Sequence, residues 1–317
     1  MPTPTAPKRV LVTGATGRSG RVFLRRLADL REAEGSLPFA VTIIARDPAR
    51  VPFSIPGVDV VRGNLDDSEF LSRIVHGHDT LLHIAGIHLS VPLIRAACAA
   101  PDGPRWFVMV HTSGIYSRYK AAGEYYRQVE SEIADITADT PCDITLLRPT
   151  MIYGAPNDGT MNVFIRLVDH LRLFPLIGDG HTAIRPVRDS DLGRAYLKVL
   201  LHYHITRGKV YDLSGGESID FIDIFRTISR LLGKRTRFIP IPPAIAYATA
   251  ATLWAVTLGR IDLRERVQRM TEPRTYSCAK AIADFGYDPV DFATGIAEEI
   301  AEYLRRNGRT ADNLGRR

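Results

Sequence analysis

A glycine-rich turn near the start of the chain has the clearest chemical signature. The segment TGATGRSG (13–20) follows an apolar run at 9–13 and precedes a helical pattern. Glycine is needed where a chain turns tightly, approaches a pyrophosphate, or packs a helix on a strand. The N–H groups that begin such a helix attract phosphate. The alternative is a turn that binds nothing. We expect a dinucleotide site that includes Gly14, Thr16, Gly17, Arg18 and Gly20.

The residue after the second apolar run distinguishes NADP from NAD. An acid at this position binds the ribose 2′-hydroxyl of NAD, whereas an arginine accommodates the 2′-phosphate of NADP. Arg46 follows FAVTIIA (39–45) directly. Together with Arg18, it places two guanidinium groups near one phosphate, which favours NADP(H). NAD stays open, because a shift of one residue would put Asp47 there.

Alternating strand and helix patterns must position these residues. Continuously apolar strands are typical of a parallel sheet covered on both faces. Such alternation predicts an α/β, Rossmann-type doubly wound fold, with residues 9–150 as the dinucleotide-binding domain. The expected strands are 9–13, 39–45, 58–62, 80–85, 106–112 and 143–147, and the expected helices are 20–30, 68–75, 91–100 and 118–136.

The pattern loosens after residue 150, where turn residues separate mainly helical segments. We expect residues 151–307 to form a smaller, mostly helical substrate-binding region that is interleaved with the core and returns strands to the sheet. Residues 1–8 and 308–317 are expected to be a flexible leader and tail. The expected helices are 162–171, 189–201, 221–232, 244–258 and 294–306.

Several short motifs follow the glycine turn in a consistent order. They are GNLD (63–66), LHIAG (82–86), HTSGIY (111–116), LRPTMIYG (147–154) and YDLSGG (211–216). The series resembles the extended and atypical short-chain dehydrogenases/reductases, which are NAD-dependent epimerase/dehydratase-like proteins. The resemblance implies that Leu65, Asp66 and Ala85 contact the cofactor, with Asp66 bonded to the adenine amino group. Read locally, Asp66 is equally well a helix cap.

The resemblance also implies where redox chemistry would occur. In this family a tyrosine hydroxyl acts as acid or base, and a lysine lowers its pKa and binds the nicotinamide ribose. A serine positions the substrate oxygen. Ser113, or Thr112 beside it, matches that serine. Tyr116 and Lys120 form the expected catalytic pair.

The position of this pair leaves other interpretations open. In relatives the tyrosine and lysine lie on the following helix, where Tyr125 and Tyr126 are nearer the expected place. Four residues beyond them stand Val129 and Glu130 instead of lysine. Either a shortened loop makes the earlier pair functional, or a tyrosine acts alone. A third interpretation is that the helix carries no catalytic pair.

Two residues are candidates for substrate binding. Arg185 follows PLIGDG (175–180), which resembles the family's substrate loop, where an arginine can hold an acidic substrate. His88 comes after the fourth strand, on the nicotinamide side by topology. His83 and His111 are expected to be packing residues. Scattered strand-end histidines do not form a metal site, so no metal is expected.

Composition narrows the classes of protein. The net charge of +6 is scattered, and no basic stripe carries interleaved aromatic residues, so a nucleic-acid partner is not expected. The 45% hydrophobic and 24% charged composition is that of a globular enzyme rather than a disordered chain. Three widely spaced cysteines fit a reducing compartment, and the leader lacks the apolar core of a signal peptide. These features predict a cytoplasmic protein.

The longest apolar stretch, 239–258, is interrupted by prolines. It predicts a buried or half-exposed helix at 244–258 rather than a membrane span. If exposed, this helix would suit a hydrophobic substrate or docking on a membrane surface. The family resemblance also implies a homodimer.

Taken together, these patterns predict an NADP(H)-dependent oxidoreductase or a nucleotide-sugar epimerase/dehydratase-like enzyme that acts on a small molecule. The alternative is a non-catalytic NAD(P)H sensor or assembly protein. The weak tyrosine–lysine pair favours this alternative, and the fold by itself does not decide between them.

Overall fold

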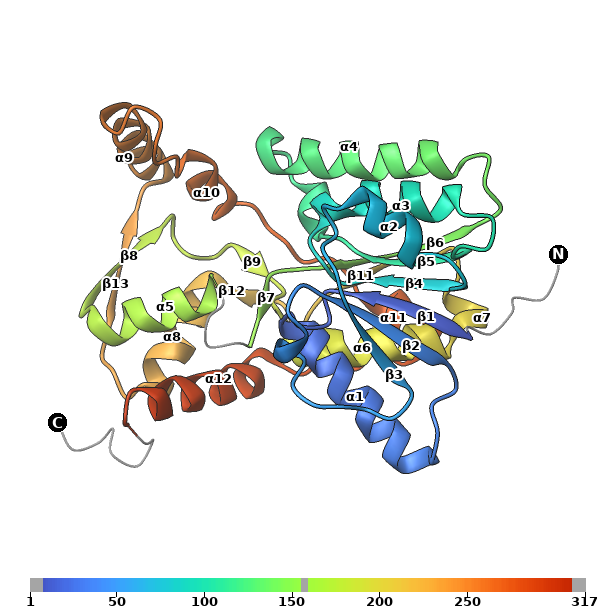
Figure 1. Cartoon of the computed structure of the whole chain (residues 1–317). Helices are drawn as coiled ribbons and strands as arrows, with labels where there is room; N and C mark the ends of the chain where they lie inside the picture. The colour runs from blue at the N-terminus through green and yellow to red at the C-terminus, as the bar shows by residue number, and fades with distance from the viewer. Residues whose placement is uncertain (1–7, 155–158, 310–317) are drawn as a thin grey trace.

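The structure, a computed structural model, describes residues 8–154 and 159–309, without the side chains of residues 120–122. Most of the predicted leader and tail therefore lies outside the described residues. Strands and helices alternate through the first part of the chain, and a second, mixed group of elements follows (Figure 1).

A seven-stranded, all-parallel sheet forms the centre of the larger part. Its order is β11-β6-β5-β4-β1-β2-β3. The chain order reverses between β1 and β4, which is where such sheets bind ligands. The predicted doubly wound α/β fold is confirmed. The strands are β1 (Arg9–Thr13), β2 (Ala40–Ala45), β3 (Val58–Arg62), β4 (Thr80–His83), β5 (Trp106–Val110), β6 (Asp143–Pro149) and β11 (Val210–Leu213).

Helices cover both faces of this sheet, each over its own apolar core. One core joins inward residues of the strands to α2 (Ser68–Ile74), α3 (Ser90–Ala99) and α4 (Lys120–Thr137). The other joins them to α1 (Arg18–Glu34), α6 (Asp189–Leu201) and α11 (Ala279–Phe285). Short elements complete this part: η1 (Pro48–Arg50), η2 (Ile87–Leu89), η3 (Ser113–Tyr116) and α7 (Tyr203–Thr206).

The second part has a separate core built on α5 (Met161–His170), α8 (Phe221–Leu231) and α12 (Phe292–Arg306). Strand pairs join its segments, and among the described strands β9 and β12 form an antiparallel pair. The strands are β7 (Ile152–Tyr153), β8 (Leu173–Ile177), β9 (Ala183–Ile184), β10 (Val187–Arg188), β12 (Ile219–Asp220) and β13 (Arg237–Ile241).

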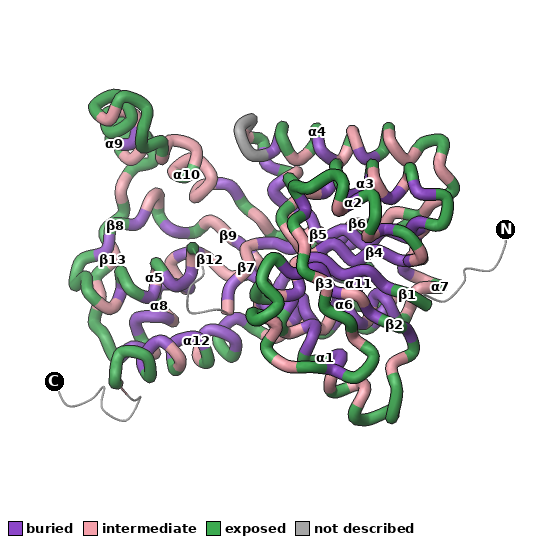
Figure 2. The backbone as a smooth tube through the Cα atoms, in the orientation of Figure 1, coloured by how far each residue is buried: buried purple, intermediate pink, exposed green. Residues whose placement is uncertain are grey.

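Helices α9 (Pro243–Val256) and α10 (Arg264–Arg269) extend from this second part (Figure 1). The apolar stretch at 244–258 does form a helix, yet Ala250 is its only buried residue among those described, and the tube there is largely green in Figure 2. None of the described helices has both the length and the apolar character needed to cross a membrane.

Candidate active site

The glycine turn joins β1 to α1 at the point where the strand order reverses. Gly14 has φ +75°, and a Cβ there would lie 2.4 Å from the backbone nitrogen of Ala85, at the end of β4. A Cβ on Gly20 would lie 2.3 Å from the carbonyl oxygen of Gly14. Only glycine allows these approaches, so the turn stays flat and close to the sheet edge.

The first turn of α1 is free to face an anion. Gly17 is its N-cap, no side chain caps the helix, and no acidic residue lies in the first turn. The unsatisfied N–H groups and the partial positive charge of the helix end suit a pyrophosphate. Thr16 and Arg18 lie in the same turn, half-buried and exposed respectively.

Two arrangements favour Arg46 as the residue that contacts the ribose phosphate. Arg46 is exposed directly after β2, and no ion pair links it to a described residue. Asp47 caps η1 instead, since its carboxylate accepts a hydrogen bond from Ala49 N at 3.1 Å. The carboxylate is therefore occupied locally, whereas the guanidinium is free to meet a phosphate.

The two aspartates after β3 also have different roles. Asp67, and not Asp66, caps α2, because its carboxylate accepts hydrogen bonds from Glu69 N and Phe70 N at 3.0 Å. Asp66 remains exposed beside the buried Leu65. The residues of the turn and the strand ends thus fit a dinucleotide.

A pocket of about 580 Å³ opens beyond the ends of β5 and β6. Thr112, Ser113 and Gly114 line one side of it. Thr112 caps η3 through its hydroxyl, which accepts from Gly114 N at 3.0 Å, and Ser113 is buried. The second part of the molecule supplies much of the remaining lining, so both parts contribute to one cavity.

Four arginines make this pocket strongly cationic. Arg185, Arg266, Arg269 and Arg274 line it, and no acidic side chain is among its described lining residues. Backbone pairing brings two of them together, because Arg185 N donates to Arg274 O at 3.1 Å. The Nε atoms of Arg185, Arg269 and Arg274 are buried without a hydrogen-bond partner among the described residues.

Clustering these charges is electrostatically costly. Burial, followed by the charge of Arg269, lowers the pKa of Arg274. Unpaired, partly buried cations of this kind are stabilised by an anion that accepts their hydrogen bonds. The pocket is therefore suited to a phosphate- or carboxylate-bearing molecule.

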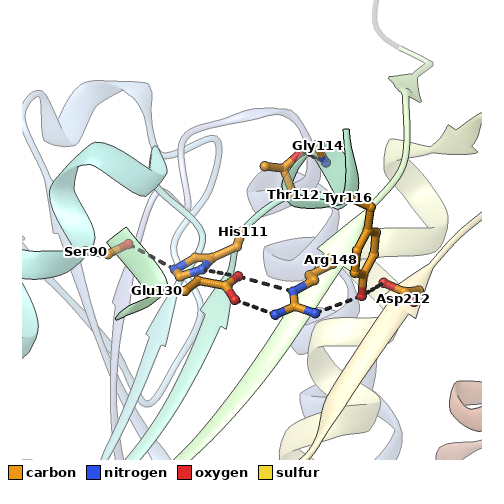
Figure 3. Close-up of polar contacts among 8 residues, drawn as sticks. All are labelled: Ser90, His111, Thr112, Gly114, Tyr116, Glu130, Arg148 and Asp212. Atoms are coloured by element: carbon orange, nitrogen blue, oxygen red, sulfur yellow. Dashed lines mark hydrogen bonds and ion pairs between the residues drawn. The ribbon is translucent and has the colours of Figure 1, made fainter. Parts of the chain in front are cut away.

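Tyr116 lies in a polar chain rather than in the pocket lining (Figure 3). Its hydroxyl donates to Asp212 Oδ1 at 3.0 Å and accepts from Arg148 Nη1 at 2.8 Å. Burial, together with the charge of Asp212, raises the pKa of Tyr116 despite the bond from Arg148. The side chain of Lys120 lies outside the described residues, so the structure does not test this pair.

Glu130 joins that chain from the second half of α4. Its carboxylate pairs with Arg148 and with His111 Nδ1, the latter at 3.1 Å, while Ser90 Oγ lies 3.2 Å from His111 Nε2 (Figure 3). Burial alone would raise the pKa of Glu130, but the bonds from His111 and Arg148 outweigh it and lower the pKa. An ionised carboxylate only accepts, so His111 donates from Nδ1.

Tyr126 lies one turn before Glu130 and beside the pocket wall. A Cβ on Gly114 would be 2.8 Å from Tyr126 Cε2, so the ring rests against that residue. Tyr125 is exposed next to it. Tyr126 therefore contacts a residue of the pocket lining.

The two predicted substrate residues occupy different places. Arg185 lines the pocket and also donates from Nη2 to Gly216 O at 2.9 Å. His88 is exposed on η2, where its ring covers Gly86, and it is not in the pocket lining. No group of described histidine, cysteine, aspartate or glutamate side chains is placed to hold a metal ion.

Sequence reasoning missed the three arginines beyond Arg185. The signal was present as RERVQRMTEPR (264–274), in which arginines recur every two to five residues. Nothing in that spacing indicated that the β-bridge between Ile184 and Arg274 would bring the segment to Arg185.

Comparison with known proteins agrees with this site. Residues 14–166 match a family model described as NAD(P)H-binding. Residues 14–166 are therefore similar to an NAD(P)H-binding domain, as the motif series predicts. The fold expected from that resemblance is confirmed. The glycine turn from Gly14 onward and the pocket residues Thr112–Gly114 lie within the matched range.

Two reductases are among the similar proteins. A (4-alkanoyl-5-oxo-2,5-dihydrofuran-3-yl)methyl phosphate reductase from Streptomyces griseus subsp. griseus is 29% identical over 231 residues, covering 72% of this chain and 76% of the reductase. A ceramide reductase from Caulobacter vibrioides is 26% identical over 256 residues, covering 76% of each chain.

A solved structure shares the fold over nearly the whole length. The dTDP-glucose 4,6-dehydratase from Streptomyces venezuelae, with NAD and TYD bound, superposes with a TM-score of 0.68 at 20% identity, covering 95% of this chain and 98% of that one. The NAD(P)H-binding domain and the second part therefore have the arrangement seen in an epimerase/dehydratase-type protein.

Proposed function

We propose that this protein is an NADP(H)-dependent oxidoreductase whose small-molecule substrate carries a phosphate or similar anionic group. The observation that carries the proposal is the set of four arginines facing Thr112–Gly114 across one pocket. The phosphate named in the substrate of the Streptomyces relative supports the same charge. The bound nicotinamide would supply hydride exchange, and the residues of this chain orient the substrate and move a proton.

Cofactor preference rests on Arg46. Because Asp47 is held by the backbone of η1, Arg46 is the group that meets a 2′-phosphate. Losing a hydrogen-bonded charge pair costs about 1.5–3 kcal/mol. Arg46→Ala should therefore weaken NADPH binding by roughly 10- to 100-fold and leave NADH binding nearly unchanged.

Titrations followed by nicotinamide fluorescence test this preference. Arg31→Ala, at the far end of α1, serves as the matched control. Equal affinity of the wild type for NADPH and NADH would contradict the role of Arg46. Failure of both to bind at micromolar concentration would contradict the proposed function as a whole.

Substrate charge rests on the pocket arginines. Pyrophosphate is a suitable probe, because it offers only anionic oxygens. It also fits the first turn of α1, so binding in the pocket is judged from the difference between variants. We expect it to bind the wild type, and Arg269→Gln or Arg274→Gln to weaken that binding about tenfold or more. Arg226→Gln, which removes an exposed arginine paired with Asp223, is the control. Titration calorimetry gives the affinities, and identical values for all variants would exclude an anion site here.

Proton transfer is assigned to Tyr126, with the hydroxyls of Thr112 and Ser113 positioning the substrate oxygen. The contact between Tyr126 and Gly114 supports this assignment over Tyr116, whose hydroxyl is held by Arg148 and Asp212. The pair Tyr116 and Lys120 stays a prediction.

Matched tyrosine variants separate the two assignments. Tyr126→Phe should lower the rate of NADPH oxidation by about 10²- to 10⁴-fold, the range for a general acid, while Tyr116→Phe changes it far less. Stopped-flow decay of NADPH absorbance with a substrate found by screening phosphorylated carbonyl compounds provides the measurement. A larger loss of rate in Tyr116→Phe than in Tyr126→Phe would instead support Tyr116 and Lys120 as the catalytic pair.

A non-catalytic NAD(P)H-binding role is the second candidate. Glu130 stands where a lysine would follow Tyr126, and this observation favours it. In that case NADPH binds, pyrophosphate binds, and no phosphorylated carbonyl compound accelerates NADPH oxidation.

A further inference from the structure

Helix α9 packs mainly against α10, and most of its residues, like most of the connecting residues 257–262, are exposed in the described part of the chain. The helix α9 carries its own apolar side chains on every side, and Ala250 alone is buried among its described residues. At the tip, Val256 is 76% exposed and Leu258 is 89% exposed. A monomeric protein in water seldom exposes such a continuous apolar surface without a use for it.

We propose that this helix pair, defined as residues 243–269, docks the protein on an anionic lipid bilayer. Fourteen residues of helix extend about 21 Å, at 1.5 Å per residue, which is shorter than the roughly 30 Å of bilayer hydrocarbon. The element therefore enters the interface from one side and does not span it.

The threonine hydroxyls on and directly after α9 are already satisfied internally. Three threonines, which would otherwise present hydroxyl groups, donate to carbonyl oxygens one turn earlier. Thr249 bonds to Ile245, Thr252 to Ala248 and Thr257 to Leu253, at 2.7–2.9 Å. In water these hydroxyls would lose nothing by facing solvent, whereas in hydrocarbon an unpaired hydroxyl is costly. The pattern suits insertion into lipid.

The charges around the helix favour an anionic surface. No carboxylate occurs between residues 224 and 261, and within 243–269 four arginines outnumber two carboxylates, Asp262 and Glu265. Arg260, directly after the tip, is exposed and has no ion pair with a described residue. Arg264 lies over the Trp254 ring at 4.2 Å and pairs with Asp262. Arginine and tryptophan beside an apolar tip are the groups that settle at a lipid headgroup layer.

A protein partner explains these features less well. A helix that binds in a protein groove presents one apolar stripe and keeps its other face polar. The apolar residues of α9 instead point in all directions, and its tip is bordered by positive charge. Leu258 is also the single described non-glycine residue with a positive φ, 52°, a strained conformation in a residue that is almost fully exposed.

Docking would bring the candidate pocket to the bilayer. Arg266 and Arg269 of α10 line that pocket, and α10 packs against α9. This arrangement indicates a substrate with an anionic head and an apolar tail, an inference that rests on the proposed function. The docking inference itself depends only on residues 243–269.

Vesicle flotation with the full chain tests the docking. The protein should float with vesicles of phosphatidylcholine and phosphatidylglycerol, bind weakly to phosphatidylcholine alone, and dissociate as salt is raised to about 1 M. The double variant Val256→Glu/Leu258→Glu should lose at least about tenfold in vesicle affinity. Ile282→Glu, on α11 and 50% exposed, is the matched control and should float like the wild type.

Tryptophan fluorescence gives an independent measurement. Trp254 is exposed whereas Trp106 is buried, so a blue shift on adding anionic vesicles reports on α9. An unchanged far-UV circular dichroism spectrum and melting temperature in the double variant show that it is folded, whatever the fate of the proposed function. The inference is overturned if anionic vesicles cause neither flotation nor a shift. It is also overturned if ultracentrifugation shows a dimer that the same double substitution dissociates.

Discussion

His83 links the cofactor turn to the neighbouring strand. Its Nδ1 lies 2.7 Å from Thr13 Oγ1, so the last residues of β4 and β1 are joined side to side beneath the glycine turn. Complete burial, more than the nearby His111, lowers the pKa of His83 to about 3. The imidazole is neutral in the folded protein at physiological pH.

This burial makes stability depend on pH. Unfolded histidine titrates near about 6.5, so the unfolded chain takes up a proton that the folded chain refuses between that pH and about 3. Stability is complete above this window and is lost as the pH falls into it, by about 1.4 kcal/mol per unit. His83→Gln should flatten the fall in unfolding free energy between pH 7 and pH 5.

Urea denaturation at the two pH values gives the comparison. Burial also lowers the pKa of His78, which contributes a fall in stability in the same direction. The pH slope of the variant is therefore compared with the wild-type slope and not with a slope of zero. The exposed His88→Gln should retain the wild-type slope. An unchanged slope in His83→Gln would contradict the assignment.

Gly20 limits what the turn can tolerate. A Cβ there meets backbone atoms of Gly14 and Ala15 at 2.3 and 2.7 Å, which no rotamer change relieves. Gly20→Ala should therefore push the turn away from the sheet, weaken NADPH binding at least about tenfold, and cost about 1–3 kcal/mol in stability. Nicotinamide fluorescence and thermal unfolding measure the two effects. Wild-type affinity would show that the dinucleotide does not sit on this turn.

At the scale of elements, α1 and α6 pack closely against each other although they lie far apart in the sequence. Gly193 of α6 lies so close to α1 that a Cβ would be 2.5 Å from Val22 Cβ and 2.8 Å from Phe23 N. A mid-helix alanine normally gains about 1 kcal/mol over glycine. Here overpacking should reverse the sign, with a net loss of about 1–2 kcal/mol for Gly193→Ala.

A double-mutant cycle identifies the cause of this loss. A Val22→Ala background keeps the Cβ contact but removes Val22 Cγ1, which would lie 2.6 Å from the new Cβ, so Gly193→Ala should cost less than in the wild type. Urea denaturation of the four proteins gives the coupling energy. Additive effects would place the strain elsewhere.

At the scale of the whole molecule, the pocket couples two cores that are otherwise separate. Because Thr112–Gly114 follow β5 of the larger part and Arg185, Arg269 and Arg274 lie in the second part, an anion bridging them should stabilise both parts together. Pyrophosphate should raise the melting temperature of the wild type, and this gain should shrink as salt screens the arginines. Differential scanning fluorimetry measures it, and a salt-independent gain would contradict electrostatic binding.

The sequence predicts the NAD(P)H-binding half well because each signal there is local. The turn and the residue after β2 lie within 50 residues of the start, and each apolar strand is recognised from its own few residues. In the second part, α6 begins and ends where expected, at Asp189 and Leu201. One strand differs, since β3 is at the sheet edge and its side chains are mostly exposed.

The pocket could not be predicted in the same way, because it depends on pairing between distant segments. Arg185 meets Arg274 across a β-bridge, and Tyr116 meets Asp212 across 96 positions. Aromatic spacing on α4 likewise gave no means of telling Tyr126, which contacts Gly114, from its exposed neighbour Tyr125. Residue type indicated the candidates, and only their tertiary contacts separate them.

The outermost strand, β11, pairs with β6 although the helix-rich segment 150–209 lies between them in sequence. Tyr196, Tyr211 and Phe285 belong to the same apolar core as Val10 and Val12. On a ribosome, the first 150 residues would emerge with β6 as an open edge and that core half-built. The β6 edge is covered only after β11 has emerged, and the core is completed only after α11 has emerged. Until β11 pairs, the bare edge is a surface for chaperones or for aggregation.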